Sequence, residues 1–223
     1  MSRQLLVMLG LPGSGKGTQG KRLAKDLGMA YLATGDLVRE VSSRAGTGDK
    51  FADEVQARKK SGRPQPDHVI IEILRRKLKT IDLESGIILD AFPISLGQTQ
   101  LLEQVIKEFK LTDPLVFFIV IDTWECVYRL TRRKFCLKCN SAFNPENEDY
   151  KKGICPNDGE KLITRDDDSF HVVRTRIEEY TYRMNHVRNY YERKGWLVPI
   201  NGSQVIDLVY SEIRAKLAEQ GNK

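Results

Sequence analysis

Short apolar runs, bounded by turn-forming residues, alternate along this chain with longer segments in which apolar residues recur at helical spacing. The runs predict strands at residues 5–9, 30–32, 87–89, 115–121 and 196–200. Helical spacing is found at Leu23 and Leu27, at residues 69–78 and at residues 101–109. Strands that alternate with helices indicate parallel pairing, and therefore an α/β fold whose sheet is covered by helices on both faces.

The run at residues 115–121 consists of seven consecutive apolar residues, as expected for a central strand buried on both faces. It is the longest apolar run in the chain, and a membrane-spanning helix needs about 20 such residues, so we expect no membrane contact. Near the C-terminus, residues 203–220 have helical spacing and a candidate N-cap at Ser203.

Two segments interrupt the alternation of strands and helices. Residues 34–86 have helical periodicity but no strand-like run, so we expect a group of helices between the second and third strands. Residues 133–164 are rich in Cys, Asn, Gly and Lys and show little helical period. Because that segment is too long for a plain loop, it predicts a small inserted subdomain that is held together by a staple of its own, such as a metal site or a disulfide.

The sequence GLPGSGKGTQ at residues 10–19 directly follows the first predicted strand and opens the first predicted helix. Glycines allow a tight turn in which backbone N–H groups point at phosphate oxygens, and the helix N-terminus adds partial positive charge. In such a phosphate-binding loop, Lys16 would reach the β- and γ-phosphates of a nucleotide, and Thr18 would lie near Mg²⁺. The candidate loop residues are Gly13, Ser14, Gly15, Lys16, Gly17 and Thr18.

The same glycines permit two other interpretations. A chance glycine-rich turn is disfavoured by the strand before it and the helix after it. Gly15, Gly17 and Gly20 also match the spacing of a dinucleotide-binding fingerprint, which would suggest a dehydrogenase. That fingerprint needs its first glycine at the strand end, whereas Gly15 lies five residues beyond Gly10, so we interpret the match as accidental.

Charged residues that suit phosphate chemistry accompany this loop. Asp90 ends the strand at residues 87–89, where it would lie beside the loop and could hold Mg²⁺ directly or through water. The alternative is a strand-end aspartate that only forms a turn. Arginine forks neutralise transferring phosphoryl groups, although any single arginine is more often a solvated surface charge. The candidates are Arg39, Arg129, Arg132, Arg133, Arg165, Arg174 and Arg176.

Composition narrows the class of protein. With 223 residues, of which 40% are hydrophobic, the chain should form one domain with insertions. Its 36 Lys and Arg residues against 30 Asp and Glu residues give a net charge of +6, which suits anionic ligands. This excess is too small and dispersed to indicate a nucleic-acid groove. Four cysteines are too few for a disulfide scaffold, so we expect a reducing, cytoplasmic environment.

Cys136, Cys139, Cys155 and Asp158 have the two-knuckle spacing of a structural zinc site, with aspartate in the last position. Four protein ligands would leave no open coordination position, so the zinc would be structural rather than catalytic. The alternatives are a Cys136–Cys139 disulfide or three idle thiols. We interpret Cys126 as a core residue. The histidines fit no ligand spacing and are expected at the surface: His68, His171 and His186.

Over essentially its whole length the chain resembles the adenylate kinases, in the long form with a large lid. The phosphate loop, with Gly between Lys and Thr, is similar to that family's variant. TGDLVR at residues 34–39 resembles the segment that holds the nucleoside monophosphate, and LDAFP at residues 89–93, followed by Gln98, resembles the segment with the adenine-reading glutamine. RLTRR at 129–133 and the stretch from 165 to 176 resemble the two ends of the lid, and NGSQ at 201–204 resembles the turn that meets the ATP adenine.

The resemblance implies a P-loop NTPase-like three-layer fold with a parallel five-stranded sheet in residues 1–223. It implies a monophosphate-binding flap at residues 36–65 and a zinc-binding lid at residues 131–168. The implied reaction transfers the γ-phosphoryl group of Mg-ATP to AMP, and we expect a monomer that binds no nucleic acid. Lys16, Arg133, Arg165 and Arg176 would clamp the transferring group. ATP would also meet Arg129 and Gln204, and AMP would meet Thr34, Arg39, Gln98, Arg165 and Arg176.

The sequence departs from the family pattern at Ala91, Arg132 and Asn201, where the family usually has Gly, Gly and Asp. At Ile94 the family carries an arginine that grips the acceptor phosphate, and an isoleucine side chain has no donor. Two alternatives follow: a kinase for a different phosphate acceptor, or a nucleotide-binding pseudokinase whose zinc lid contacts partners. A nearby basic residue, for instance Arg63 or Arg75, could also have taken over the contact.

Overall fold

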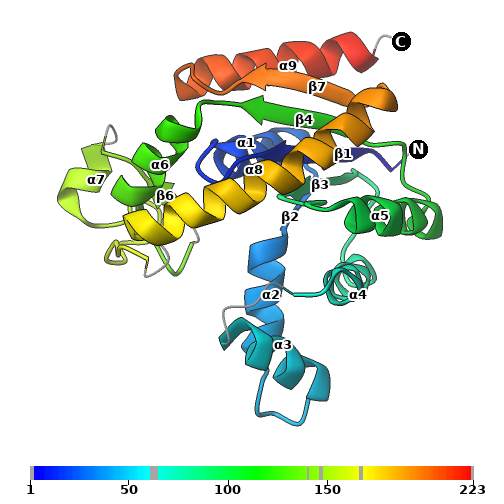
Figure 1. Cartoon of the computed structure of the whole chain (residues 1–223), viewed down its shortest axis with the longest axis horizontal. Helices are drawn as coiled ribbons and strands as arrows, with labels where there is room; N and C mark the ends of the chain where they lie inside the picture. Colours follow the sequence, from blue (N-terminus) through cyan, green and yellow to red (C-terminus); the bar gives the residue numbers. More distant parts are fainter. Residues whose placement is uncertain (1–2, 61–64, 140, 146–147, 166–167, 222–223) are drawn as a thin grey trace.

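The computed structural model describes residues 3–60, 65–139, 141–145, 148–165 and 168–221. A five-stranded parallel sheet with the strand order β2-β3-β1-β4-β7 forms its centre, which confirms the predicted α/β fold (Figure 1). The strands are β1 (Leu5–Gly10), β2 (Ala30–Ala33), β3 (Ile87–Asp90), β4 (Leu115–Val120) and β7 (Leu197–Asn201). All five predicted strands are present, with ends that differ by one residue.

The central strand β1 is buried along its whole length, between β3 and β4. Its side chains alternate between two cores, because successive residues of a strand point to opposite faces of the sheet. Leu5, Val7 and Leu9 join the larger core, and Leu6 and Met8 join the smaller one. The sheet is therefore apolar on both faces and must be covered on both.

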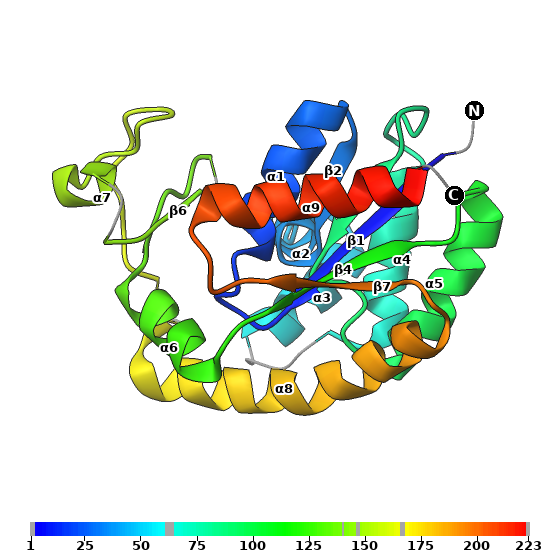
Figure 2. The same ribbon diagram turned by 90° about the horizontal axis from the view of Figure 1, so that it is seen from above.

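Helices cover the two faces as predicted (Figures 1 and 2). The helices α1 (Lys16–Leu27) and α9 (Ile206–Gly221) pack on the smaller core, and Figure 2 shows α9 running over the sheet. The helices α4 (Asp67–Leu78), α5 (Leu96–Phe109) and α8 (Phe170–Arg193) pack on the larger core. In the described part of the chain, no helix combines the length and the apolar character that a membrane span requires.

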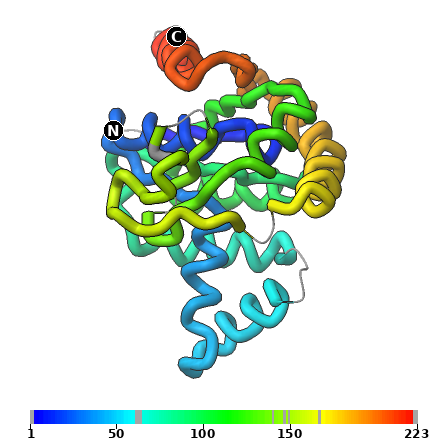
Figure 3. Tube along the Cα trace, turned by 90° about the vertical axis from the view of Figure 1, so that its left-hand side faces the viewer, coloured from blue at the N-terminus to red at the C-terminus, as the bar shows by residue number. Residues whose placement is uncertain are grey.

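In the described part of the segment between β2 and β3 lie three helices, as the periodicity of residues 34–86 predicts: α2 (Thr34–Ser42), α3 (Lys50–Lys60) and α4. Figures 1 and 3 show α2 and α3 projecting away from the sheet. Their apolar side chains Leu37, Val41, Ala52 and Val55 are buried, and they continue the larger core outward. The Nζ atom of Lys77 on α4 also lies 3.0 Å from the Glu40 carboxylate on α2.

A second group of elements projects from the sheet in a different direction, to the left in Figure 1 and in front in Figure 3. It follows α6 (Thr123–Arg132) and consists of the antiparallel pair β5 (Lys134–Phe135) and β6 (Ala142–Phe143) and the short helix α7 (Glu148–Lys152). It has its own small buried cluster of Cys136, Phe143, Cys155 and Leu162. We call residues 134–165 the cysteine module; the described part of it has little helix, as its composition predicts.

The C-terminal helix begins later than its sequence pattern suggests. α9 starts at Ile206, so the predicted N-cap Ser203 is wrong. The Asn201 side chain instead accepts the Ser203 N–H at 3.0 Å, which holds residues 201–203 in a turn before the helix. Serine is favoured in turns as well as at N-caps, so its presence alone does not locate the helix start.

One polar cluster ties α5 to α8. The Glu103 carboxylate accepts a hydrogen bond from the Tyr190 hydroxyl and lies 3.1 Å from the Lys194 Nζ atom. The hydrogen bond from Tyr190, aided by Lys194, lowers the pKa of the Glu103 carboxyl. The charged form of Glu103 is therefore favoured by folding.

Tyr190→Phe removes this donor but keeps the ring. Because Glu103 is partly exposed, we expect the free energy of unfolding at pH 7 to fall by only about 0.5–1 kcal/mol. A carboxyl whose pKa is lowered by folding stabilises above its unfolded value, about 4.3, and loses that contribution as the pH falls through the folded value. The difference between wild type and Tyr190→Phe, measured by denaturant unfolding, should thus shrink below about pH 4.3. Tyr182→Phe, on the exposed face of the same helix, is the control.

Candidate functional site

The loop after β1 is held open by glycines and leads directly into α1. Gly10, Gly13 and Gly15 have φ angles of 143°, 84° and 93°, which other residues rarely adopt. A Cβ atom on Gly13 would also lie 2.9 Å from the Cys126 carbonyl oxygen on α6, so the loop packs tightly there. Gly15 is the N-cap of α1 and offers no side-chain acceptor. The N-terminus of α1 therefore lacks a side-chain cap and can bind an anion.

Lys16, the first residue of α1, turns back over this loop. Its Nζ atom donates to the Leu11 carbonyl oxygen at 3.3 Å. Burial lowers the pKa of Lys16, the negative charge of Asp90 raises it, and the charges of Arg176 and Arg133 lower it further. The charges of three other sequence-predicted residues, Asp90, Arg133 and Arg176, therefore act on the Lys16 ammonium group at the end of the loop. Thr18 lies on the exposed side of α1.

Asp90 ends β3 next to the loop and is only 7% exposed. Its Oδ2 atom accepts a hydrogen bond from the Tyr31 hydroxyl on β2, whereas its buried Oδ1 atom has no hydrogen-bond partner among the described residues. Burial raises the pKa of Asp90, and the Lys16 charge and the Tyr31 hydrogen bond oppose that shift. A buried carboxylate oxygen without a partner fits a hydrated Mg²⁺, which prefers oxygen ligands.

Arg133, which directly precedes the cysteine module, and Arg176 on α8 meet on one carboxylate. Arg133 donates to both oxygens of Asp168, with Nε–Oδ2 and Nη2–Oδ1 distances of 2.6 and 2.8 Å. Arg176 lies 3.6 Å from the same side chain, which is fully buried. The sequence motif contains Asp168 but gives it no role, because its partner Arg133 is 35 residues away. Asp167 lies outside the described residues.

The other residues predicted to bind the nucleotide phosphates or the ATP base lie on α6, after β7 and in the cysteine module. Arg129 on α6 donates to Glu125 at 2.8 Å and to the Gly202 carbonyl oxygen at 3.3 Å, so it joins α6 to the turn after β7. Gln204 in that turn donates to Glu212 at 2.6 Å. Arg165 lies in the cysteine module, with its guanidinium carbon 5.1 Å from the centre of the Phe135 ring.

Three of the residues predicted to bind AMP, namely Thr34, Arg39 and Gln98, lie on α2 and α5, the helices that follow β2 and β3. Thr34 donates to the Ala91 carbonyl oxygen at 3.1 Å, and Arg39 pairs with Asp36 within α2. The buried Gln98 amide is fixed at both ends. Its Oε1 atom accepts the Ile94 N–H at 2.8 Å, and its Nε2 atom donates to the Asp67 carboxylate at 2.8 Å. Sequence reasoning identified Gln98 but missed Asp67, which belongs to a different helix.

Ile94 is a partly buried residue that packs against the larger core. Of the two basic residues that could replace its missing charge, Arg75 pairs with Glu108 on α5 at 2.8 Å. Arg63 lies outside the described residues. Ala91, where a glycine is usual in the similar family, has a φ angle of 56°, a conformation that favours glycine.

Cys136, Cys139, Cys155 and Asp158 form a group that could hold a metal ion, since their ligand atoms all lie within 4.8 Å of one another. The Cys136 sulfur is 3.3 and 3.4 Å from the two Asp158 oxygens, and the Cys139 and Cys155 sulfurs are 3.5 Å apart. All four cysteines of the chain are free, so the alternative Cys136–Cys139 disulfide is absent. A tetrahedral site with Zn–S bonds of about 2.3 Å separates its sulfurs by roughly 3.8 Å, close to the observed spacing.

The other cysteine and the histidines are placed as predicted. Cys126 is fully buried in α6, and burial raises the pKa of its thiol to about 11. His68, His171 and His186 are all exposed.

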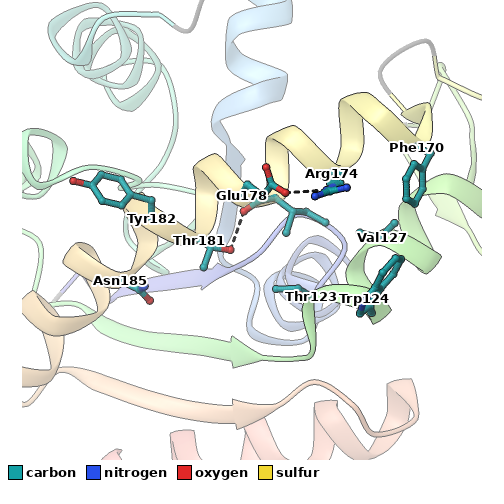
Figure 4. Close-up of a pocket in the computed structure, with 10 residues that line it drawn as sticks. Thr123, Trp124, Val127, Phe170, Arg174, Glu178, Thr181, Tyr182 and Asn185 are labelled. Carbon is teal, nitrogen blue, oxygen red and sulfur yellow. Dashed lines mark hydrogen bonds and ion pairs between the residues drawn. The ribbon is translucent and has the colours of Figure 1, made fainter.

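A separate groove of about 620 Å³ lies between α6 and α8 (Figure 4). The Trp124 and Phe170 rings stack at one end of it, and Tyr182 stands at the other. Of the residues predicted for the site, the candidate Arg174 lines this groove, where it pairs with Glu178 at 2.9 Å, and the others do not. We therefore assign it no part in the chemistry at the phosphate loop.

Comparison with known proteins identifies close relatives. The family model for adenylate kinase matches residues 8–196. An adenylate kinase from Archaeoglobus fulgidus is 36% identical over 216 residues, which is 95% of this chain and 97% of that protein. Adenylate kinases from Bacillus velezensis, at 34%, and Thermodesulfovibrio yellowstonii, at 32%, are aligned over 95% and 96% of this chain and 97% and 99% of their own lengths.

Proposed function

The chain belongs to the adenylate kinase family, and from this premise we propose that it transfers the γ-phosphoryl group of Mg-ATP to AMP, giving two ADP molecules. Membership makes it a phosphotransferase and supports a nucleoside monophosphate kinase. Neither a pseudokinase nor a kinase for a different acceptor is supported by the relatives. A cytoplasmic location and a monomeric state stay predictions.

The observation that carries the proposal is the convergence of charges at the end of the phosphate loop. The charges of Asp90, Arg176 and Arg133 all act on Lys16 there. Phosphoryl transfer develops charge on the oxygens of the moving group and needs little covalent chemistry, so positioning and charge stabilisation are sufficient. Mg²⁺ bound with ATP neutralises the β- and γ-phosphate oxygens, and Asp90 and Thr18 are the residues that would hold it.

On the donor side, the loop N–H groups and Lys16 would bind the ATP phosphates, with Arg129 and Gln204 near the base. On the acceptor side, Thr34, Arg39 and Gln98 would hold AMP, with α2 and α3 forming the flap. The two sides lie beyond neighbouring ends of β1 and β3 in the parallel sheet, where α/β folds bind ligands. This arrangement favours direct in-line transfer between the two nucleotides.

We also propose that the cysteine module is the lid and that it binds structural zinc. The salt bridge between Arg133 and Asp168 joins the residues on either side of the module, and Arg165 is the last residue of the module. Closing such a lid would bring arginines to the phosphates and exclude water, which otherwise would hydrolyse ATP. Three thiolates and one carboxylate make a closed tetrahedral set, so the metal would hold the lid together rather than react.

Replacing Lys16 by Met tests the proposed phosphate site. The substitution keeps much of the stem but removes the charge, so we expect kcat for ATP and AMP to fall by about 10³-fold or more with the fold intact. Lys25→Met, on an exposed position of the same helix, is the matched control and should be close to wild type. If Lys16→Met retained more than about a tenth of the rate, a loss of only ~1.4 kcal/mol, the assignment would be wrong.

Metal analysis tests the zinc assignment. Protein purified without chelators should contain about one zinc ion per chain, because the four ligands form one tetrahedron. Cys155→Ser should lose the metal and lower the unfolding temperature of the cysteine module, since its small buried cluster depends on the staple. Cys126→Ala, which changes a buried cysteine outside the cluster, should keep the metal. A zinc-free wild-type preparation would contradict the assignment.

Ile94→Arg tests whether the acceptor site lacks a charge. A charge-assisted hydrogen bond contributes roughly 1.5–3 kcal/mol, so an added guanidinium that reaches the acceptor phosphate should lower KM for AMP about tenfold or more. Ile94→Gln places a polar but uncharged side chain, shorter than that of arginine, at the same position, so it separates the effect of the charge from the effect of lost apolar packing. The measurement is AMP saturation kinetics at saturating Mg-ATP, and an unchanged or raised KM for AMP in Ile94→Arg would refute a weakened acceptor site.

A further inference from the structure

Tyr31 on β2 is the residue that holds Asp90 in place. The strands β2 and β3 pair in parallel with Ala33 opposite Asp90, so Tyr31 lies two residues back along the neighbouring strand. Its hydroxyl nevertheless reaches the carboxylate and donates to Oδ2. Tyr31 is half-buried, and no sequence motif marks it.

The first turns of α1 are shaped to admit the Tyr31 side chain. A Cβ atom on Gly20 would lie only 2.9 Å from Cε2 of the Tyr31 ring. A Cβ atom on Gly17 would lie 3.5 Å from the Tyr31 hydroxyl oxygen and 3.2 Å from Asp90 Oδ2. Both glycines therefore make room for the hydrogen-bonded pair. This close approach accounts for Gly17 and Gly20, and the φ angle of 93° accounts for Gly15, so each of the three glycines has a role in the fold without a dinucleotide fingerprint.

The hydrogen bond decides which carboxylate oxygen of Asp90 is available. An aspartate side chain rotates broadly about its last torsion unless a partner fixes it. Tyr31 engages Oδ2 and leaves Oδ1, which is buried and has no partner among the described residues. Gly17 and Gly20 allow the ring to approach closely enough for this contact, so the orientation is built into α1, β2 and β3 together.

We propose that Tyr31 is a positioning residue that holds Asp90 with Oδ1 available to the hydrated Mg²⁺ of the bound nucleotide. This inference rests on the proposed function, because it gives Tyr31 a role in the binding of Mg-ATP. Tyr31 touches neither nucleotide nor metal in this role and acts only through Asp90. The loss of its hydroxyl therefore affects the metal-dependent part of nucleotide binding, and it leaves the contacts of the loop with the phosphates intact.

Tyr31→Phe is the test, because it removes the donor and keeps the ring on Gly17 and Gly20. The binding readout is the affinity for a non-hydrolysable β,γ-imido analogue of ATP, titrated calorimetrically in Mg²⁺ and in EDTA. We expect the affinity in EDTA to stay within about twofold of wild type and the gain in affinity from Mg²⁺ to shrink about tenfold, the scale of one charge-assisted hydrogen bond. In kinetics, kcat should fall about tenfold while KM for AMP is unchanged.

Tyr210→Phe is the matched control. Tyr210 on α9 makes the same kind of hydrogen bond to an aspartate, Asp26 on α1, at the far end of that helix. It should lower stability without changing the gain in affinity from Mg²⁺. If Tyr31→Phe kept the wild-type gain, or weakened binding equally in Mg²⁺ and EDTA, Tyr31 would have a structural role only and the proposal would be overturned. Absence of ATP and AMP turnover in wild type would instead refute the proposed function, and the binding comparison would still decide the role of Tyr31.

Discussion

The site depends on keeping the opposite charges of Lys16 and Asp90 close together at the carboxyl edge of a buried sheet. Taking charged groups out of water is costly unless each has a partner. The parallel pairing of β1 with β3 solves this problem, because the loop after β1 and the end of β3 reach the same edge. Each charge then favours the ionised form of the other against burial. The glycines that let the loop and α1 approach this edge follow from the same requirement.

The two projecting parts of the molecule are built differently, and this difference fits their proposed roles. The helices α2 and α3 extend the larger core, so they are tied to the sheet through apolar contacts. The cysteine module has a separate cluster of only a few buried residues. A cluster of that size cannot by itself offset the loss of chain entropy, so the proposed metal bound by the four converging ligands would supply the missing stability. The module then joins the sheet through α6, α8 and the salt bridge between Arg133 and Asp168.

Local patterns were sufficient to predict the parts of the structure that are contiguous in sequence. The strand, glycine loop and helix from Leu5 to Leu27 form one unit, and the ligands of the metal group sit on two tight turns. Three contributors to the site could not be predicted in this way: Tyr31, Asp67 and Asp168. Each meets its partner through the fold, across 59, 31 and 35 residues respectively, and none has a distinctive local pattern. Ser203 shows the converse, because a residue suited to an N-cap is used in a turn instead.

In the proposed function, the phosphate loop binds ATP and the surface beyond β3 binds AMP. Phosphorus NMR of purified wild-type protein with Mg-ATP and each common nucleoside monophosphate in turn measures this directly, because donor and product signals are resolved in one experiment. We expect AMP to be the preferred acceptor. We also expect ATP and AMP to disappear in equal amounts while ADP forms. Faster transfer to another monophosphate, or loss of ATP to inorganic phosphate without ADP formed from AMP, would contradict the proposed function.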